Sequence, residues 1–401
     1  MNPTERLFDI NSNLFDFQAT VLSAEEEGGT LAVVLDATAF FPEGGGQYAD
    51  PGTLGGYPVL DVQETGGVIT HMVDVPAGGW HAFSVGEQVR GVVDADTRRM
   101  RMCNHTGEHI VSGIVHRKYG FTNVGFHLGD KDVTLDFDGV LTRKQLDEVE
   151  DEANRVVAAC LPVRAFYPAP EELAGMAYRS KLALTENVRI VEIGPPDAPV
   201  DRCACCAPHV TSTGEIGLIK LLDFIHYKGG VRIHMLCGAW ALGDYRRRYA
   251  ETASIAAAMS VKQEDVLVGF SRMQAEMEEK KQTISALRGK LQALTVAGIA
   301  RTEGSLCYFD EGLEALEMRR LLNELKAKCG LLCGVFSGND TDGYRFVIGR
   351  GTEAIDLKPL SKEINAALSA RGGGSSEMLQ GTATAPRSVI EAYFTQKKIC
   401  F

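Results

Sequence analysis

The chain has 401 residues, 45% of them hydrophobic and 23% charged, and its formal net charge at pH 7 is −12. This length exceeds what one hydrophobic core supports, so we expect a globular protein of two or three domains. The acidic balance argues against bulk attraction to nucleic acid, so an RNA partner would have to meet local basic patches. No stretch approaches the roughly 18 apolar residues of a membrane span, and residues 1–6 do not resemble a signal peptide, so we expect a cytoplasmic protein without membrane contact.

Short apolar runs alternate with glycines from about residue 15 to residue 93. Runs of this length, separated by turn residues, predict antiparallel strands. We expect a small β-barrel to form the N-terminal domain, residues 1–95. The predicted strands are residues 19–22, 31–35, 59–62, 68–73 and 89–93.

The most unusual part of this domain is residues 36–47, which read DATAFFPEGGGQ. Three glycines permit backbone conformations and a close ligand approach that side chains would block. A triple glycine by itself is more often only a turn. We predict that a substrate pocket is built around this turn, with Thr38 and Gln47 as catalytic residues and Glu43, Gly44, Gly45 and Gly46 as substrate-binding residues.

From residue 97 to about residue 116 the pattern becomes helical and contains the motif HTGEH. Its histidines, His105 and His109, are four residues apart, so they share one helix face and can both reach one metal ion. A histidine pair at this spacing is often only a solvated or core pair, so the motif does not establish a site alone. Glu108 is the candidate catalytic base, although it does not stand where HExxH proteases place theirs, which weakens that role without excluding it.

A second cluster, CACCAPH at residues 203–209, supplies the remaining ligands. Cys205 and His209 repeat the four-residue spacing beside a proline, which is disfavoured inside a helix, so we expect a loop. Four Cys or His side chains in seven positions are hard to explain by packing in a reducing cell. Cys203 or Cys206 could compete with Cys205 as the ligand. The predicted ligands of one zinc ion are His105, His109, Cys205 and His209.

Short elements complete a zinc-containing α/β domain, predicted to span residues 96–243. Residues 126–138 look strand-like, and residues 142–160 predict an amphipathic helix with Thr142 as its cap. The apolar face of this helix comprises Leu146, Val149, Ala153 and Val157. The other elements are a buried strand at residues 188–193 and a hairpin-like pair at residues 216–225 and 231–236.

Residues 244–300 predict a long helical connector, because residues 244–294 lack proline and carry apolar residues at three- and four-residue spacing. Ser260 with Gln263 three residues later is a capping-box pattern, so we expect a break and a fresh helix start near Ser260. A helical hairpin and a coiled coil joining two copies both fit this pattern, so a homodimer through this helix or the C-terminal domain is one of two open interpretations.

After about residue 301 the order is strand, helix, strand, strand, helix, helix, which predicts a small α/β domain at residues 301–401. Between its last two helices, residues 371–381 predict a second glycine-rich loop. The N–H groups of Gly372, Gly373 and Gly374 could meet phosphate or carbonyl oxygens there. The elements are expected at residues 306–309, 316–328, 331–336, 344–348, 360–370 and 389–397.

Basic residues precede and follow the metal helix and open a later helix. Such groups are more often a solvated face than a binding site. We take Arg98 and Arg99 as candidates for substrate binding, because they directly precede the metal motif. The groups are Arg98, Arg99 and Arg101; Arg117 and Lys118; and Arg246, Arg247 and Arg248.

Four motifs in the same order resemble those of the alanyl-tRNA editing proteins, which include the free-standing AlaX type and the editing and C-terminal domains of alanyl-tRNA synthetase. The resemblance spans nearly the whole chain, and the ordered combination is far more specific than any one motif. The family commonly has small residues between the second cysteine and histidine, whereas this chain has Cys206, Ala207 and Pro208. The motifs are residues 36–47, HTGEH, residues 205–217, and residues 372–380, which resemble a loop of the DHH-associated domain.

The resemblance implies trans-editing, the zinc-dependent hydrolysis of serine, or of glycine, from mischarged tRNA(Ala). It also implies that Thr38 meets the substrate hydroxyl, because the family places a threonine there. An aminoacyl ester is already activated, so the protein mainly positions water and stabilises the oxyanion. Zinc with an open position can activate that water, whereas four protein ligands leave it to orient substrate or hold the fold. We expect no aminoacylation domain ahead of the barrel.

Two other classes of function stay open. A zinc hydrolase of small esters or amides would share the metal site but need neither the connector nor the terminal domain. A non-enzymatic tRNA-binding protein with structural zinc would keep both domains and show no turnover. Metal-dependent release of serine from charged tRNA separates the three.

Overall fold

A computed structural model describes residues 2–396 apart from residues 28, 77, 78, 80, 130, 131 and 181–186. The chain forms two compact units, an N-terminal unit (Met1–Ile255) and a C-terminal unit (Ala256–Phe401). Both units mix helices with sheets, in agreement with the expected α+β class. The finer predicted division at residues 95, 243 and 300 stays a prediction. None of the described helices is both long and apolar enough to cross a membrane.

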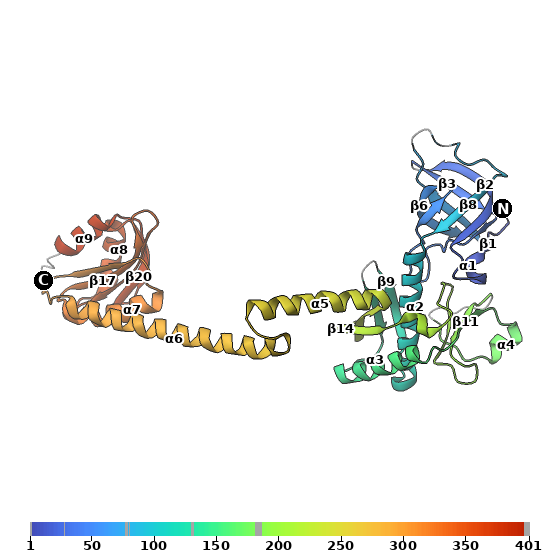
Figure 1. The fold of residues 1–401 in the computed structure, drawn as a ribbon. Helices are drawn as coiled ribbons and strands as arrows, with labels where there is room; N and C mark the ends of the chain where they lie inside the picture. Colours follow the sequence, from blue (N-terminus) through green and yellow to red (C-terminus); the bar gives the residue numbers. More distant parts are fainter. Residues whose placement is uncertain are drawn as a thin grey trace. The chain divides into compact units, whose positions relative to one another are not determined.

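The first part of the N-terminal unit is a six-stranded barrel (Figure 1). Its strands pair antiparallel in the order β2-β3-β7-β6-β5-β8, and β8 pairs again with β2, which closes the sheet. Alternate residues point inward, as in the exposed and buried alternation at the start of β2. The predicted antiparallel barrel is therefore present. Its strands are β2 (Asp16–Glu27), β3 (Thr30–Leu35), β5 (Gly52–Leu54), β6 (Tyr57–Thr65), β7 (Val68–Val73) and β8 (Gln88–Val93).

Short elements pack beside this barrel. The strand β1 (Glu5–Arg6) pairs in parallel with β4 (Ala37–Thr38), and the single helical turn α1 (Leu7–Ile10) follows β1 directly. Phe8 of α1 is buried against Phe41, with ring centroids 5.6 Å apart. This contact fixes the start of the chain beside the glycine motif.

The long helix α2 (Ala95–Tyr119) leads from the barrel into the rest of the N-terminal unit (Figure 1). Asp94 caps its first turn by accepting a hydrogen bond from the Thr97 N–H, and Gly120 ends it in the left-handed conformation, with φ 73°. The HTGEH motif lies in the middle of α2, where the residues from 104 to 115 are all buried. A helix that is buried on every side passes through the core of a domain. In this part of α2, the face opposite His105 and His109 is therefore buried as well.

Two small sheets and the helix α3 (Arg143–Ala158) surround α2. The predicted cap is present, because Thr142 and Gln145 form a reciprocal capping box. The predicted apolar face of α3 is confirmed, since its buried residues are Leu146, Val149, Ala153 and Val157. One sheet has the order β14-β15-β10-β9 and the other the order β11-β12-β13. Their strands are β9 (Asn123–Leu128), β10 (Val133–Phe137), β11 (Val163–Phe166), β12 (Ile190–Ile193), β13 (Asp201–Ala204), β14 (Ile219–Tyr227) and β15 (Gly230–Cys237), with α4 (Pro170–Gly175) after β11.

The predicted connector is two helices, α5 (Gly238–Ala258) and α6 (Val266–Gly298), and the boundary between the units falls inside α5. The break occurs at Ser260, as predicted, where the backbone is left-handed with φ 54°. The predicted capping box at Ser260 is wrong, because α6 begins later and its N-cap, Asp265, makes no side-chain cap bond. A left-handed residue ends a helix rather than starting one, so Ser260 belongs to the end of α5.

The C-terminal unit contains a five-stranded sheet in the order β16-β17-β18-β20-β19, parallel only between β16 and β17. The predicted strands and helices are present, and the last predicted helix ends at Gln396, since Lys397 lies outside the described residues. The elements are α7 (Ala315–Leu325), α8 (Leu357–Ala367), α9 (Arg387–Gln396), β16 (Leu306–Asp310), β17 (Leu332–Asn339), β18 (Gly343–Arg350), β19 (Ala370–Gly374) and β20 (Met378–Ala383).

The prediction that Gly372, Gly373 and Gly374 lie in a loop is wrong. They belong to β19, which forms a hairpin with β20 at the edge of the sheet. Glycine is needed here for close strand approach, because a Cβ on Gly374 would lie 2.1 Å from the Met378 carbonyl oxygen. Glycines that satisfy packing between strands cannot be told from glycines of a loop by composition alone.

Candidate metal centre

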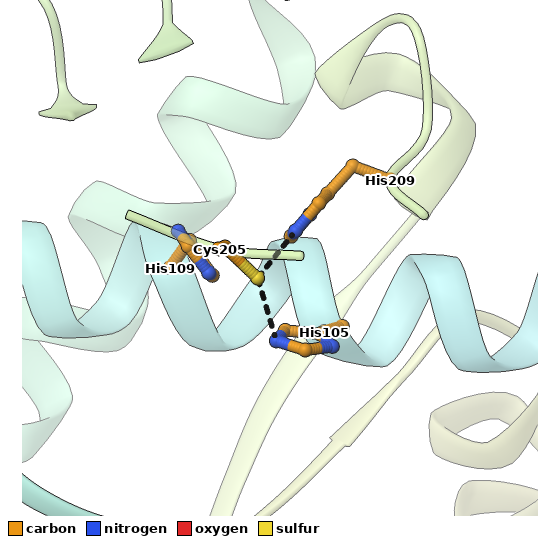
Figure 2. Close-up of side chains that lie close together, drawn as sticks. All are labelled: His105, His109, Cys205 and His209. Carbon is orange, nitrogen blue, oxygen red and sulfur yellow. Dashed lines mark hydrogen bonds between the residues drawn. The ribbon is translucent and has the colours of Figure 1, made fainter. Parts of the chain in front are cut away.

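The four predicted zinc ligands lie together in the core of the N-terminal unit. His105 and His109 project from one face of α2, while Cys205 and His209 approach from the segment after β13 (Figure 2). The Cys205 sulfur lies 3.6 Å from His105 Nε2 and 3.4 Å from His209 Nε2, and the four ligand atoms all lie within 4.8 Å of one another. In a tetrahedral zinc site the nitrogen and sulfur ligands are about 3.6 Å apart, so the group has the dimensions of such a site.

Each histidine is oriented by a hydrogen bond from Nδ1, which turns Nε2 toward the common centre. Such bonds fix the tautomer and the ring orientation of metal-binding histidines, and strengthen them as ligands. The three acceptors come from separate parts of the chain. They are Gln47 Oε1 for His105 (2.9 Å), Asp201 Oδ2 for His109 (3.1 Å) and Thr106 Oγ1 for His209 (3.0 Å).

Asp201 is the charged member of this supporting set. Arg179 donates two hydrogen bonds to its carboxylate, of 2.7 and 2.8 Å, from Nε and Nη2. Burial would raise the pKa of Asp201, but the hydrogen bonds from His109 and Arg179 outweigh burial and lower that pKa to about 2. The carboxylate is therefore ionised at neutral pH and can stabilise positive charge on a metal-bound His109.

The two ligands of the second cluster differ in exposure, since His209 is buried and Cys205 is half-buried. Burial raises the pKa of the Cys205 thiol, and burial lowers the pKa of His209. His209 is therefore neutral, which is the form that binds metal, whereas the Cys205 thiol would lose its proton to solvent when a metal ion binds. Cys203 instead groups with His109 and Asp201, and Cys206 is exposed. This geometry favours Cys205 over its neighbours as the thiolate ligand.

Glu108 lies at the edge of the ligand group. Its Oε1 accepts hydrogen bonds from Ser112 Oγ (2.8 Å) and Asn123 Nδ2 (2.6 Å), while its Oε2 lies 3.6 Å from His109 Nε2. The side chain is almost wholly buried. The carboxylate is thus held rigidly with one oxygen beside the metal-facing nitrogen, which is a position from which it could reach a water molecule near the metal.

A cavity of about 330 Å³ opens onto this group. Of the predicted glycine motif only Gly45 lines it, and Gln47 lies behind His105, 1% exposed. Gly44 and Gln47 exchange two backbone hydrogen bonds of 3.0 Å, so the motif forms a tight turn, with Gly45 and Gly46 left-handed. Glu43 instead accepts a hydrogen bond from Gln63 and does not line the cavity.

Two predicted substrate contacts have structural surroundings instead. Thr38 is fully buried in the barrel, where its hydroxyl lies 2.8 Å from His71 Nε2 and accepts a hydrogen bond from the Phe40 N–H. Arg98 is also fully buried, paired with Asp50. Both placements correct the prediction, because a side chain enclosed on all sides cannot meet a substrate. Arg99 is exposed above the Phe15 ring, and Gly372, Gly373 and Gly374 belong to the other unit.

Several side chains that support the ligand group or line its cavity were not predicted from the sequence. Asp201 stands two residues before the cysteine cluster, and this proximity was its only local signal. Arg6, Tyr167 and Arg189 also line the cavity, and Arg189 Nη1 donates to the carbonyl oxygens of Cys205 (3.0 Å) and Ala207 (2.9 Å). These residues are far apart in the sequence, and no periodic pattern connects them.

The chain is similar to aminoacyl-tRNA synthetases. The family "tRNA synthetases class II (A)" matches residues 10–97, and the family "Threonyl and Alanyl tRNA synthetase second additional domain" matches residues 188–234. The second match contains Cys205 and His209. Two of the four candidate ligands therefore lie in a segment that is shared with synthetases.

Curated relatives carry the name alanine–tRNA ligase. The ligase of Pyrobaculum neutrophilum is 32% identical over a match that covers 94% of this chain and 42% of the ligase. The ligase of Halorubrum lacusprofundi is also 32% identical, over a match that covers 92% of this chain and 40% of the ligase. The chain thus spans about two fifths of these relatives. A crystal structure of the C-Ala domain from Aquifex aeolicus alanyl-tRNA synthetase matches 23% of this chain and 87% of that chain at 24% identity. Its TM-score of 0.20 is too low to relate the two folds.

Proposed function

This chain belongs with the alanyl-tRNA synthetases and their editing relatives, and on that premise we propose that it is a zinc-dependent deacylase of mischarged tRNA(Ala). The substrate we propose is tRNA(Ala) carrying serine, or glycine, in place of alanine. The reaction is hydrolysis of the ester that joins the amino acid to the terminal ribose. The similarity covers only about two fifths of the length of the synthetases. That this chain carries out the deacylation by itself is therefore part of the proposal.

One observation carries the proposal: His105, His109, Cys205 and His209 meet at a cavity that also contains the rigidly held Glu108. Zinc held by the four ligands would supply positive charge that orients and polarises the ester beside Glu108. A structural zinc site also has four protein ligands, but it does not need a cavity beside them. Access of a small molecule to the ligands therefore favours a chemical role.

Glu108 is the group we propose as the base. Its Oε2 would accept a proton from water as the water oxygen attacks the ester carbon. The same proton would then pass to the ribose oxygen as the ester C–O bond breaks, so the carboxylate ends the reaction ionised. Ser112 and Asn123 hold Oε1 and keep Oε2 turned toward the ligands. Gln47 contributes indirectly, because its hydrogen bond orients His105.

Deacylation of charged tRNA tests the proposal. We expect the full chain to release serine from Ser-tRNA(Ala) much faster than alanine from Ala-tRNA(Ala), and to lose this activity on treatment with a chelator. Glu108→Gln should lower kcat by about a hundredfold or more while zinc stays bound, as for other general bases. Glu172→Gln, a change on an exposed glutamate of α4, should leave kcat unchanged.

The alternatives predict other results. If zinc is only structural and the chain only binds tRNA, serine release would be absent from the metal-loaded protein. If the chain is a hydrolase of small esters, simple seryl esters would react as fast as Ser-tRNA(Ala). Full activity of Glu108→Gln would reject the base role and leave the metal group as the only candidate for activating water.

A further inference from the structure

The cavity beside the metal group is also lined by side chains that have no part in the proposed hydrolysis. They are Arg6, Tyr167 and Arg189, none of which belongs to the metal group. Tyr167 lies between β11 and α4 and is 52% exposed, although it borders a site whose ligands are buried. A large aromatic side chain left open to solvent in a concave site commonly serves as a contact surface for a ligand.

Tyr167 is open but it is not loosely held. Its hydroxyl donates a hydrogen bond of 3.0 Å to Asp9 Oδ2, and Asp9 Oδ1 forms an ion pair of 3.0 Å with Arg189 Nε. Arg6 lies 3.9 Å from the same carboxylate. Asp9 therefore joins three side chains from distant parts of the chain into one wall, with the tyrosine hydroxyl tied down and the ring left at the cavity.

This wall is also tied to the metal group. Arg189 donates from Nη1 to the carbonyl oxygens of Cys205 and Ala207, which lie in the segment that carries two of the ligands. Tyr167, Asp9, Arg189 and the ligand segment are thus connected by hydrogen bonds and by the ion pair between Asp9 and Arg189. A group resting on the Tyr167 ring would have a defined position relative to the metal group.

The substrate of the proposed reaction supplies such a group. The ester is attached directly to the ribose of the last nucleotide, so a carbonyl placed at the metal group brings that nucleoside into the same cavity. Bases stack on aromatic side chains through their π-faces, and each stacked base contributes about tenfold or more to affinity. We propose that Tyr167 is the platform on which the terminal adenosine of tRNA stacks while its ester lies at the metal group. This identity of the ligand rests on the proposed function.

Binding of uncharged tRNA(Ala) tests the platform without requiring catalysis. The probes are tRNA(Ala) ending in CCA and the same tRNA with the terminal adenosine removed, measured at one fixed salt concentration because phosphate contacts depend on salt. We expect the wild-type chain to bind the complete tRNA about tenfold more tightly than the shortened one. Tyr167→Ala should bind both with the affinity that the wild type shows for the shortened tRNA.

Two further variants separate stacking from a structural role. Tyr167→Phe keeps the ring and loses only the bond to Asp9, so most of the tenfold preference should remain. Tyr245→Ala removes a tyrosine that is 63% exposed on α5, outside the cavity, and should keep the whole preference. All variants should retain one zinc per chain, which reports that the Arg189 contacts and the ligand segment are intact.

The results distinguish failure of the platform from failure of the proposed function. A wild-type chain indifferent to the terminal adenosine, or a Tyr167→Ala chain that keeps the preference, would overturn the platform even if serine is released normally. A chain that keeps the predicted preference but releases no serine would retain the platform and reject the deacylase. Absence of any tRNA(Ala) binding would overturn both.

Discussion

His105, His109 and His209 differ in their surroundings but share one arrangement, in which Nδ1 is bonded to another side chain and Nε2 faces the common centre. An isolated pair of histidines at helical spacing has no such constraint, since each ring can turn. This shared arrangement is what a preformed metal site requires, and it favours such a site over three histidines that happen to be near one another.

The ligand set predicts one zinc per chain by elemental analysis. His105→Ala combined with His209→Ala should remove the metal, because two of four ligands are lost. His116→Ala, on an exposed histidine of the same helix, should keep it. Cys205→Ala should reduce zinc content more than Cys203→Ala or Cys206→Ala. Full zinc in Cys205→Ala would promote one of its neighbours to ligand.

Asp201 should matter to the metal without touching it. Asp201→Asn removes the charge that supports His109, and such changes beside a ligand typically weaken metal affinity 10- to 100-fold. Competition against a chelator of known affinity measures the change. Asp197→Asn, on an exposed aspartate four residues earlier, should bind zinc as the wild type does. Equal zinc affinity in both variants would mean that the bond from His109 to Asp201 does not contribute to metal binding.

His71 gives the barrel a predicted pH dependence. Nδ1 bonds to the Val33 carbonyl oxygen, so Nδ1 carries the proton and Nε2 accepts from Thr38. Burial lowers the pKa of His71 from 6.5 to about 4. Because the folded pKa lies below the unfolded one, protonation favours the unfolded chain. Barrel stability should be full above pH 6.5 and should fall by about 2 kcal/mol between pH 7 and pH 5.

Hydrogen exchange of the β3 and β7 amides, corrected for intrinsic rates, measures this dependence. His71→Gln keeps a donor and an acceptor but does not titrate, so its barrel stability should be flat over the same pH range. His81→Gln, on an exposed histidine, should retain the wild-type slope. A wild-type barrel whose protection is equal at pH 5 and pH 7 would contradict the lowered pKa.

At the scale of elements, α6 is the helix whose apolar residues are least covered. Seven of them follow a heptad pattern and are each at least 43% exposed. Lys280 occupies the one core position of this pattern that is not apolar. In a parallel pair two copies of Lys280 would face each other, whereas in an antiparallel pair each would face an apolar residue. The seven are Phe270, Met273, Met277, Ile284, Leu287, Leu291 and Leu294.

We therefore propose that α6 pairs with α6 of a second copy, antiparallel. Ile284→Lys combined with Leu287→Lys places two charges among the seven apolar residues of the heptad pattern. This change should convert the dimer to monomer in sedimentation experiments. Gln282→Lys, on the outer face of the same helix, should leave the dimer intact. A wild-type chain that sediments as a monomer would contradict the pairing and leave the exposed heptad pattern unexplained.

At the scale of the whole molecule, the metal centre and its cavity lie entirely within the N-terminal unit. That unit has its own two hydrophobic cores, one in the barrel and one around α2. The C-terminal unit has a sheet and helices but contains none of the candidate metal groups found among the described residues. The candidate metal centre and the C-terminal unit are thus built from separate parts of the chain.

A chain that ends after Ala258 should accordingly keep one zinc and its kcat for Ser-tRNA(Ala). We propose that the C-terminal unit adds tRNA affinity, so the loss should appear as a higher KM for tRNA. Measuring KM and the sedimentation coefficient of the same shortened chain separates two roles. Unchanged KM with conversion to monomer would reject tRNA anchoring and leave dimerisation as the function of the C-terminal unit.

Local patterns determined much of the architecture. Short apolar runs between glycines located five of the six barrel strands but not β5, and the Thr142 capping box located α3. The four-residue spacings selected the residues that meet at the candidate metal centre. These features depend on contacts within a few residues along the chain, so periodicity and turn chemistry reveal them.

Only the tertiary structure decided how the site is supported and what surrounds it. The bonds that orient the three histidines join residues 58, 92 and 103 positions apart. Long-range packing also enclosed Thr38 and Arg98 and left Tyr167 open. A side chain's burial depends on which distant segments cover it, and local sequence carries little information about those segments. The metal ligands could therefore be proposed from the sequence, whereas the cavity wall formed by Arg6, Tyr167 and Arg189 required the fold.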